Sequence, residues 1–174
     1  MPTWDTPINI MEMLRLSLAN PHIANWLPDD PGPVLNVGHG EKYIEGAEHI
    51  DWPAWDADSD PIPCAAESFQ TIYAIHFLEH VKQPVVMLRE LQRVLRVGGH
   101  LNIALPYYST QGAIHDLDHK GSMWCEETWR HTFNNPYYAK DHDGWQFEIG
   151  ANLIMGILEK NVLLITQLIK TEPK

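Results

Sequence analysis

The sequence contains few cysteines, few basic residues and no long apolar run. Its 174 residues include only Cys64 and Cys125, which lack metal-motif spacing. Twelve lysines and arginines stand against 23 acids, a formal net charge of −11. Because no basic run could release counterions from phosphates, we expect neither nucleic acid nor an anionic membrane as a partner. With no membrane span and no signal peptide recognisable, we expect a cytoplasmic protein.

The stretch Val34–Gly40 organises the rest of the chain. Apolar β-forming residues lead directly into Gly38 and Gly40, which is typical of a buried parallel strand that ends in a glycine turn. Such a turn lets the backbone approach a ligand at the carboxyl end of a sheet, although many Gly-x-Gly pairs are ordinary tight turns.

A second, short strand is expected at Glu48–Ile50, followed by Asp51. Only nine residues separate Gly38 from Glu48, whereas a crossover that contains a helix needs roughly ten to twelve. The first crossover is therefore predicted to hold a loop or a single turn. An acid after strand two is placed to bind ribose hydroxyls, and a solvated strand end is the alternative for Asp51.

The middle of the chain alternates strand, helix and strand. Phe69–Ile75 is rich in β-branched and aromatic residues, and Pro84 opens a segment with helical apolar periodicity. We expect that helix to carry Arg96 in its last turn and to stop at Gly98-Gly99. Leu101–Leu105 follows as another buried strand, so the pattern predicts a parallel α/β sheet.

The two ends of the chain differ from this core. An amphipathic helix is predicted over residues 7–19. Residues 107–144 are rich in histidine, aspartate and aromatic residues, with a short helix at 126–132. The apolar segments 146–157 and 162–169 predict an antiparallel hairpin at the sheet edge.

The chain resembles a compact class I S-adenosylmethionine-dependent methyltransferase of the type 11 kind. The resemblance covers residues 34–106, and Asn36 and Gln70 stand where many relatives carry acids. Five motifs in register carry it: Leu35-Asn36-Val37-Gly38-His39-Gly40; Asp51; Asp56-Ala57 with Pro61-Ile62-Pro63 and Glu67-Ser68-Phe69; Ile75-His76-Phe77-Leu78-Glu79-His80; and Arg93-Val94-Leu95-Arg96-Val97-Gly98-Gly99.

The resemblance implies a Rossmann-like class I methyltransferase fold. We expect an α/β sheet that is mostly parallel, with a reversed last strand and a shortened first crossover. One domain should span residues 1–174. Its expected parts are an N-terminal helix and loop (1–30), a cofactor-binding core (33–106), an acceptor-side loop region (107–144) and a terminal hairpin (145–170).

The resemblance also implies S-adenosylmethionine as cofactor. Asp51 would accept the ribose hydroxyls and Asp56 the adenine amine, while His76 and Phe77 would lie near the sulfonium. Because the short crossover lacks a helix N-terminus, backbone N–H groups of 39–41 would serve the methionine end. The residues expected to bind the cofactor are Asn36, Val37, Gly38, His39, Gly40, Asp51, Trp52, Asp56, Ala57, His76 and Phe77.

The acceptor side is expected after the fifth motif. A sulfonium is already a strong electrophile, so the protein mainly aligns the acceptor, and a base is needed only for a hydroxyl or a protonated amine. His115, Asp116 and His119 are the candidate catalytic residues. Metal ligation by His115, Asp118 and His119 is an alternative to a solvated loop, and no metal is expected. His80 is interpreted as a structural histidine that caps the next helix.

The expected function is methyl transfer to a small molecule or a sugar, at oxygen. The alternative is a methyltransferase-like module that has lost catalysis and serves in binding or assembly. The short crossover leaves one sheet face bare, and the 7–19 helix is predicted to cover it. Remaining apolar surface, with Trp4, Trp26 or Trp55, would be buried in a homodimer. The alternative is a monomer closed by loops.

Overall fold

The computed structural model of the protein describes residues 32–41, 43–120, 123–134, 144–157 and 161–173. All of them belong to one unit, Gly32–Lys174. The predicted helix at residues 7–19, the loop that follows it and part of the acceptor-side region lie outside the described residues. Among the residues described, no helix is both long enough and apolar enough to cross a membrane.

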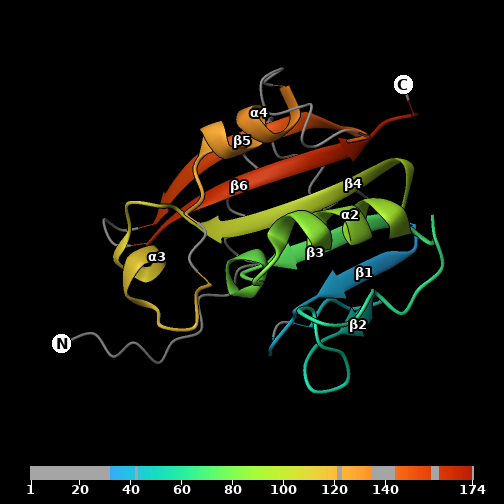
Figure 1. The fold of residues 1–174 in the computed structure, drawn as a ribbon, viewed down its shortest axis with the longest axis horizontal. Helices are drawn as coiled ribbons and strands as arrows, with labels where there is room; N and C mark the ends of the chain where they lie inside the picture. The colour runs from blue at the N-terminus through green and yellow to red at the C-terminus, as the bar shows by residue number, and fades with distance from the viewer. Residues whose placement is uncertain (1–31, 42, 121–122, 135–143, 158–160, 174) are drawn as a thin grey trace. The chain divides into compact units, whose positions relative to one another are not determined.

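The described strands form a mixed sheet in the order β2-β1-β3-β4-β6-β5 (Figure 1). The parallel strands β2, β1, β3 and β4 come first, β6 pairs antiparallel with β4, and β5 pairs antiparallel with β6 at the edge. The expected Rossmann-like sheet with a reversed last strand is confirmed. The strands are β1 (Val34–Val37), β2 (Glu48–Ile50), β3 (Phe69–Ile75), β4 (Leu95–Pro106), β5 (Phe147–Ile157) and β6 (Asn161–Lys170).

The central strands are buried along their whole length. All four residues of β1 are buried, and six of the seven residues of β3 are buried as well. Parallel strands in the middle of an α/β sheet bury both faces, which explains why these segments are almost entirely apolar. The core therefore surrounds the carboxyl ends of β1 and β3, where the glycine turn begins.

The first crossover is short, as predicted. Its described residues, 38–41 and 43–47, contain no helix. The turn is closed instead by the N–H of Gly38, which donates to the carbonyl of Ile50 at 2.9 Å. The rings of His39 and Tyr43 pack against His49 on β2, with centroids 5.1 Å away in each case. Side-chain packing thus does part of what a crossover helix does in larger sheets.

Four short helical elements follow in the described chain: η2 (Leu78–His80), α2 (Pro84–Val94), α3 (Gln111–His115) and α4 (Glu126–Asn134). Proline occupies the first turn of α2, as predicted. Helix α4 and the hairpin of β5 and β6 also confirm the sequence prediction.

The predicted end of α2 is wrong. The helix ends at Val94, and Arg96 and Gly98 belong to β4. The register of β3 against β4 shifts between Phe69 and Thr71, where Gly98 adopts a positive φ of 74°. A Cβ on Gly99 would lie 2.8 Å from the carbonyl oxygen of Arg96, so the chain turns too tightly there for a side chain. The glycine pair serves this irregularity in the strand rather than a helix stop.

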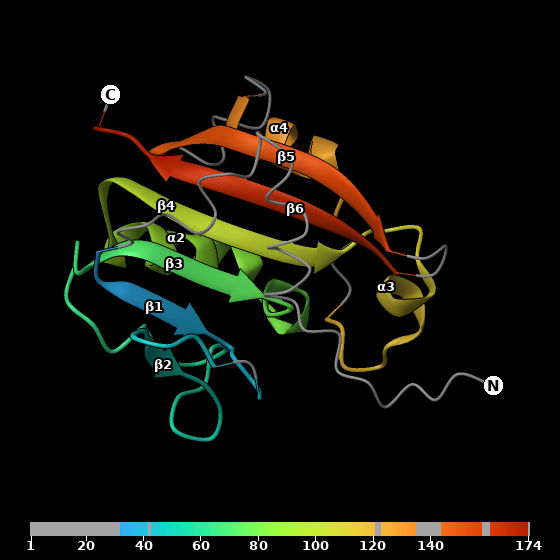
Figure 2. The same cartoon turned by 180° about the vertical axis from the view of Figure 1, so that it is seen from behind.

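The helices are distributed unevenly over the sheet. In Figures 1 and 2, α2 and α4 lie on the same face, and the opposite face carries none of the described helices. Helix α3 and η2 lie beyond the carboxyl ends of β1, β3 and β4 in both views. Those ends therefore face the segments in which the sequence places the cofactor and acceptor residues.

Aromatic side chains fill the core between α4 and the hairpin. Trp129 is fully buried and stacks on Trp124 and Phe133, with centroids 5.2 and 6.0 Å away. Phe133 in turn contacts Trp145, whose ring lies 3.8 Å from the Arg89 guanidinium carbon. Trp124 and Trp129 are core residues, and the partly buried Trp145 packs against that core.

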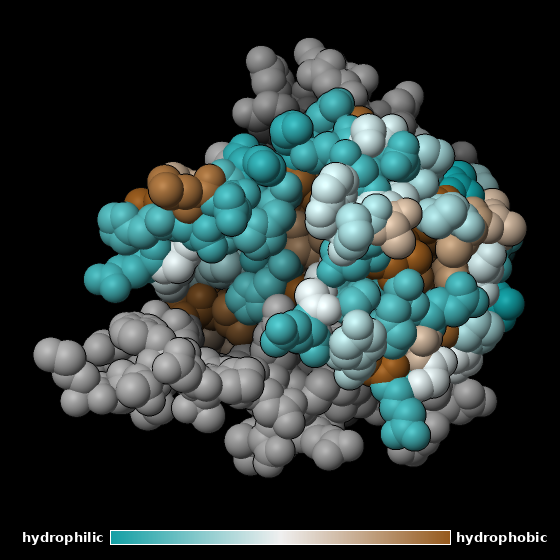
Figure 3. Space-filling model, turned by 90° about the horizontal axis from the view of Figure 1, so that it is seen from below, coloured by the Kyte–Doolittle hydropathy of each residue, from teal (hydrophilic) through white to brown (hydrophobic). Residues whose placement is uncertain are grey.

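The β2 edge of the unit has a mostly hydrophilic surface. Seen from below in Figure 3, apolar residues appear mainly in recesses between hydrophilic ones. This agrees with a chain that carries 23 acidic residues.

Candidate functional site

A pocket of about 220 Å³ opens at the carboxyl ends of the parallel strands. Its walls come from the residues after β2, the loop that leads to β3, and the turn from β3 into η2 and beyond. Six of the eleven residues expected to bind the cofactor line it. The lining residues are Asp51, Trp52, Trp55, Asp56, Ala57, Asp58, His76, Phe77, His80 and Val81.

Gly38 lies directly behind one wall of this pocket. Its φ is +62°, and a Cβ added there would lie 2.1 Å from Cδ2 of Phe77. The missing side chain therefore makes room for the buried Phe77 ring. Gly40 differs, since its φ is +52° but a Cβ there would meet nothing within 4 Å. Gly38 is required both by its positive φ and by its close contact with Phe77. Gly40 is required by its positive φ alone.

Asp51 connects the glycine turn to the end of β2. Its Oδ2 accepts the N–H of Gly40 at 2.6 Å, and its Oδ1 accepts the N–H of Trp52 at 2.8 Å. Each carboxylate oxygen has a second lone pair for a further donor. The carboxylate is therefore held at the pocket by two backbone donors, and its role as a ribose acceptor stays a prediction beside the alternative of a solvated strand end. The Gly40 N–H is also already engaged, so it is not free for a ligand in this conformation.

Asp56 is held in a tight local turn. Its Oδ1 accepts the N–H of Asp58 at 3.0 Å. This hydrogen bond and one from Ser59 lower the pKa of Asp56 below its ordinary value. Asp58 accepts the N–H of Lys82 at 2.7 Å, which connects the loop to the segment before α2. The pocket thus presents the Asp56 carboxylate on an anchored loop.

Trp55, predicted to be buried in a homodimer, is instead buried within the chain and lines the pocket. It is buried, and its Nε1 donates to the carbonyls of Asp60 and Pro61 at 3.2 and 3.0 Å. Its ring lies 6.1 Å from that of Phe77, so the two form one apolar wall. An isolated tryptophan in an irregular loop carries no periodic signal that could have identified it.

The loop that carries these residues is clamped onto α2. Arg93 donates to the carbonyls of Ile62 and Cys64, each at 2.8 Å. It also pairs with Glu90 at 2.8 Å, and Glu90 accepts the N–H of Ile62 at 3.1 Å. Hydrogen bonds from Arg93 lower the pKa of Glu90, and the same pairing raises the pKa of Arg93. The Arg93 of the fifth motif therefore positions the pocket loop.

His76 occupies the turn from β3 into the pocket in a strained backbone conformation. Its φ of +53° is in the left-handed region, which non-glycine residues seldom adopt. Its Nδ1 lies 3.1 Å from Oε1 of Glu79, a residue that is 1% exposed. Sequence reasoning did not single out Glu79, although a charged residue inside an otherwise apolar element was a signal for it.

The other five expected cofactor residues lie on β1 and its turn and do not line the pocket: Asn36, Val37, Gly38, His39 and Gly40. Asn36 is buried, with its Nδ2 3.4 Å from Nδ1 of His49. Val37 is fully buried in the core. The Nδ1 of His39 is buried without a hydrogen-bond partner.

The structure pairs two of the three candidate catalytic residues, Asp116 and His119. His115 is exposed at the end of α3, whose first turn is capped by the Thr110 hydroxyl. Asp116 is also exposed, and its Oδ2 lies 3.6 Å from Nε2 of His119. The His119 side chain is only 9% exposed, and its ring contacts that of His80 with centroids 4.8 Å apart. His119 is thus joined to the pocket through His80, whose Nδ1 faces the carbonyl of Asp118 at 3.4 Å.

Comparisons with known proteins agree with this geometry. Residues 35–103 match the model of the methyltransferase domain family. No curated protein sequence matches the chain.

Several solved structures share the fold. A chain of the Haloferax volcanii complex that contains the methyltransferase activator Trm112 aligns with a TM-score of 0.64, at 12% identity, over 93% of this chain and 92% of that one. A SAM-dependent methyltransferase from Methanosarcina mazei aligns with a TM-score of 0.59 at 14% identity, over 87% of this chain and 97% of that one. A SAM-dependent methyltransferase from Aquifex aeolicus aligns with a TM-score of 0.53 at 14% identity, over 93% of this chain and 98% of that one.

The family match covers β1 to β4, and the fold match extends to the reversed hairpin. The expected fold is confirmed, and residues 35–103 match the expected family. The chain is therefore similar in fold to S-adenosylmethionine-dependent methyltransferases of known structure, and its residues 35–103 match the methyltransferase domain family.

Proposed function

We propose that the chain transfers the methyl group of S-adenosylmethionine to a hydroxyl oxygen of a small molecule or a sugar. One observation carries the proposal: the carboxylates of Asp51 and Asp56 line the same pocket as the Phe77 ring, at the carboxyl ends of parallel strands. Ligands of open α/β sheets bind at this edge. Two fixed acceptors and an apolar wall fit a nucleoside with hydroxyl and amine donors.

Each pocket residue then has a distinct task. Asp51 accepts the ribose hydroxyls with the lone pairs that Gly40 and Trp52 leave, each bond worth roughly 1.5–3 kcal/mol. Asp56 accepts the adenine amine. His76 and Phe77 lie at the methyl-donor end, where the strained turn fixes their positions.

S-adenosylmethionine, when bound, supplies a methyl group whose carbon bonds to the acceptor oxygen as the carbon–sulfur bond breaks and leaves the electron pair on sulfur. The chain's part is to align that oxygen and to accept or release its proton. Of the three candidates, His119 is joined to the pocket through its contact with His80. His115 and Asp116 face solvent, where they are placed to pass a proton outward.

A turnover screen tests this function. The purified protein is incubated with isotopically labelled S-adenosylmethionine and a panel of small hydroxyl compounds, sugars and matched amines, and methylated product is detected by mass spectrometry. We expect label in hydroxyl compounds or sugars, with equal amounts of S-adenosylhomocysteine. Label only in amines would contradict the oxygen target.

The alternative of an inactive binding or assembly module rests on the short crossover. The pocket nevertheless persists beside that crossover, with both carboxylates in place, which favours an enzyme. Binding of S-adenosylhomocysteine together with no turnover across the whole panel would favour the module.

A homodimer stays a prediction, as does a cytoplasmic location. The Haloferax match to a complex with an activator protein makes a protein partner a further candidate. Light scattering over a wide concentration range tests the dimer, which is contradicted by a constant mass near the 19.9 kDa of one chain.

A further inference from the structure

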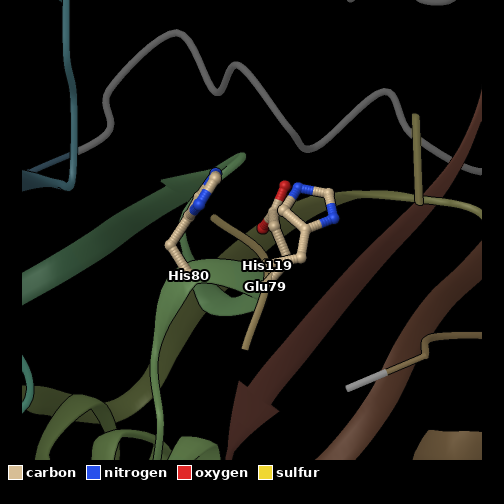
Figure 4. Close-up of side chains that lie close together, drawn as sticks. All are labelled: Glu79, His80 and His119. Atoms are coloured by element: carbon tan, nitrogen blue, oxygen red, sulfur yellow. The ribbon is translucent and has the colours of Figure 1, made fainter. Parts of the chain in front are cut away.

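Three potential metal-binding side chains meet beside the pocket. Glu79 and His80 come from η2, and His119 comes from the segment after α3. One ligand atom from each lies within 4.8 Å of the other two. Figure 4 shows the Glu79 carboxylate beside the His119 ring, with the His80 ring next to them. The fold thus joins two distant segments of the chain at this point.

The Glu79 carboxylate is buried and only half satisfied. The residue is 1% exposed, and its Oε1 is 3.1 Å from Nδ1 of His76. Its Oε2 is buried without a hydrogen-bond partner. An unpaired buried polar atom costs roughly 1–3 kcal/mol, and more when the group is charged. A cation bound to Oε2 would remove that cost.

The two imidazoles are oriented as metal ligands usually are. Nδ1 of His119 lies 3.3 Å from the carbonyl oxygen of Ala113, and Nδ1 of His80 lies 3.4 Å from that of Asp118. A proton on each Nδ1 would point at its carbonyl and leave the Nε2 lone pair for a metal. Metal-binding histidines commonly use such carbonyls to fix their tautomer and ring orientation. The exposed Asp116 carboxylate, whose Oδ2 is 3.6 Å from Nε2 of His119, is a further acidic group beside the site.

We propose that Glu79, His80 and His119 bind a divalent transition-metal ion of the Zn²⁺ type. Two imidazoles and one carboxylate are the ligand set of many catalytic zinc sites, whereas Mg²⁺ and Ca²⁺ prefer oxygen ligands alone. Tetrahedral Zn²⁺ brings its ligand atoms to about 3.4 Å from one another, so small side-chain rotations close the site.

The position of the ion suggests its role. His80 also lines the pocket, so the ion would lie at the pocket wall, with at least one coordination position left by the three protein ligands. The next step rests on the proposed function: the acceptor oxygen occupies that open coordination position. The hydroxyl then loses its proton to solvent at a pH where a free hydroxyl keeps it, because a bound cation lowers the pKa of its ligand. The acceptor class is therefore a metal-chelating hydroxyl compound. With the ion bound, His119 serves as a metal ligand in place of the general base.

Metal titration tests the site without reference to activity. The full chain is stripped with EDTA, dialysed and titrated with Zn²⁺ in competition with a chromophoric chelator. We expect one ion per chain, with affinity lowered at least tenfold by His80→Ala and by His119→Ala. The control His131→Ala removes an exposed histidine on α4 and should leave affinity unchanged. Absence of one-to-one binding, or equal affinity in all variants, would overturn the proposal.

Glu79→Gln needs a separate readout because the residue is buried. Circular dichroism first checks that the variant folds, and Co²⁺ then reports the ligand set through its visible absorption. We expect Co²⁺ to give a low-symmetry spectrum with the wild type that changes in Glu79→Gln and disappears in His119→Ala. A spectrum that is the same in all three proteins would overturn the site.

Failure of the metal site and failure of the proposed function are distinguishable. If S-adenosylhomocysteine binds to the EDTA-treated protein but Zn²⁺ binds nowhere, only the metal inference fails. If Zn²⁺ binds through the three residues and no methyl transfer occurs with any acceptor, the metal site stands and the methyl-transfer function fails.

Discussion

The carboxylate of Asp51 accepts the backbone N–H of Gly40 at 2.6 Å, across the shortened first crossover. This bond fixes the glycine turn to the end of β2 where larger relatives would place a helix. It also gives Asp51 two tasks, one in the turn and one toward a ligand. Substitutions can separate the two tasks.

Asp51→Ala should weaken S-adenosylhomocysteine binding at least tenfold, about 1.4 kcal/mol. The reason is that both the ribose acceptor and the support of the turn are lost. Asp51→Asn keeps one oxygen for a backbone donor but loses the charge, so it should retain the wild-type melting temperature and still bind weakly. Calorimetric titration measures the affinity of both variants for S-adenosylhomocysteine. Wild-type affinity in Asp51→Ala would show that Asp51 does not belong to the site.

Gly38→Ala should be far more damaging than Gly40→Ala. Both introduce a Cβ at positive φ, which costs roughly 1–2 kcal/mol. Only at Gly38 does the Cβ also collide with the Phe77 ring, at 2.1 Å, which adds an overpacking cost of about 1–3 kcal/mol. Urea denaturation of the two variants measures the difference. Equal stability losses would mean that Phe77 moves aside freely.

The sequence predicted the strands, the short crossover and the reversed hairpin because apolar periodicity and glycine positions are local signals. It could not predict that Gly98 serves a strand irregularity, since that depends on the fit of β3 against β4. The roles of Trp55 and Glu79 were also missed. Trp55 packs against Phe77 and Glu79 meets His119, and no spacing rule contains such contacts between distant segments. The charge of Glu79 in an otherwise apolar element was a local signal that was not used.

Arg93→Ala should remove part of the acid sensitivity of the fold. Hydrogen bonds from Arg93 lower the pKa of Glu90 in the folded state below its ordinary 4.5. The unfolded state therefore binds more protons in acid, and the stabilisation is complete above about pH 4.5 and lost as pH falls through the lowered pKa.

Urea midpoints of wild type and Arg93→Ala between pH 7 and pH 3 test this. The difference in urea midpoint between wild type and Arg93→Ala should become smaller as the pH falls toward 3. A gap of constant size would show that the ion pair contributes nothing to the pH dependence.

His119→Ala should lower turnover with an identified acceptor by about a hundredfold or more, with cofactor affinity unchanged. His119 is the candidate whose ring reaches a pocket residue. His115→Ala and Asp116→Ala should have smaller effects, because both residues are exposed. Single-turnover rates and cofactor titrations of the three variants give the comparison. Unchanged rates in all three would indicate that alignment alone drives the transfer.

Titration of the wild-type chain with S-adenosylhomocysteine shows whether the pocket binds the product form of the cofactor. We expect one site per chain and competition by S-adenosylmethionine, with the heat of binding greatly reduced in Asp51→Ala. A chain that is folded by circular dichroism yet gives no binding heat, and no competition for labelled S-adenosylmethionine at millimolar concentration, would contradict this expectation.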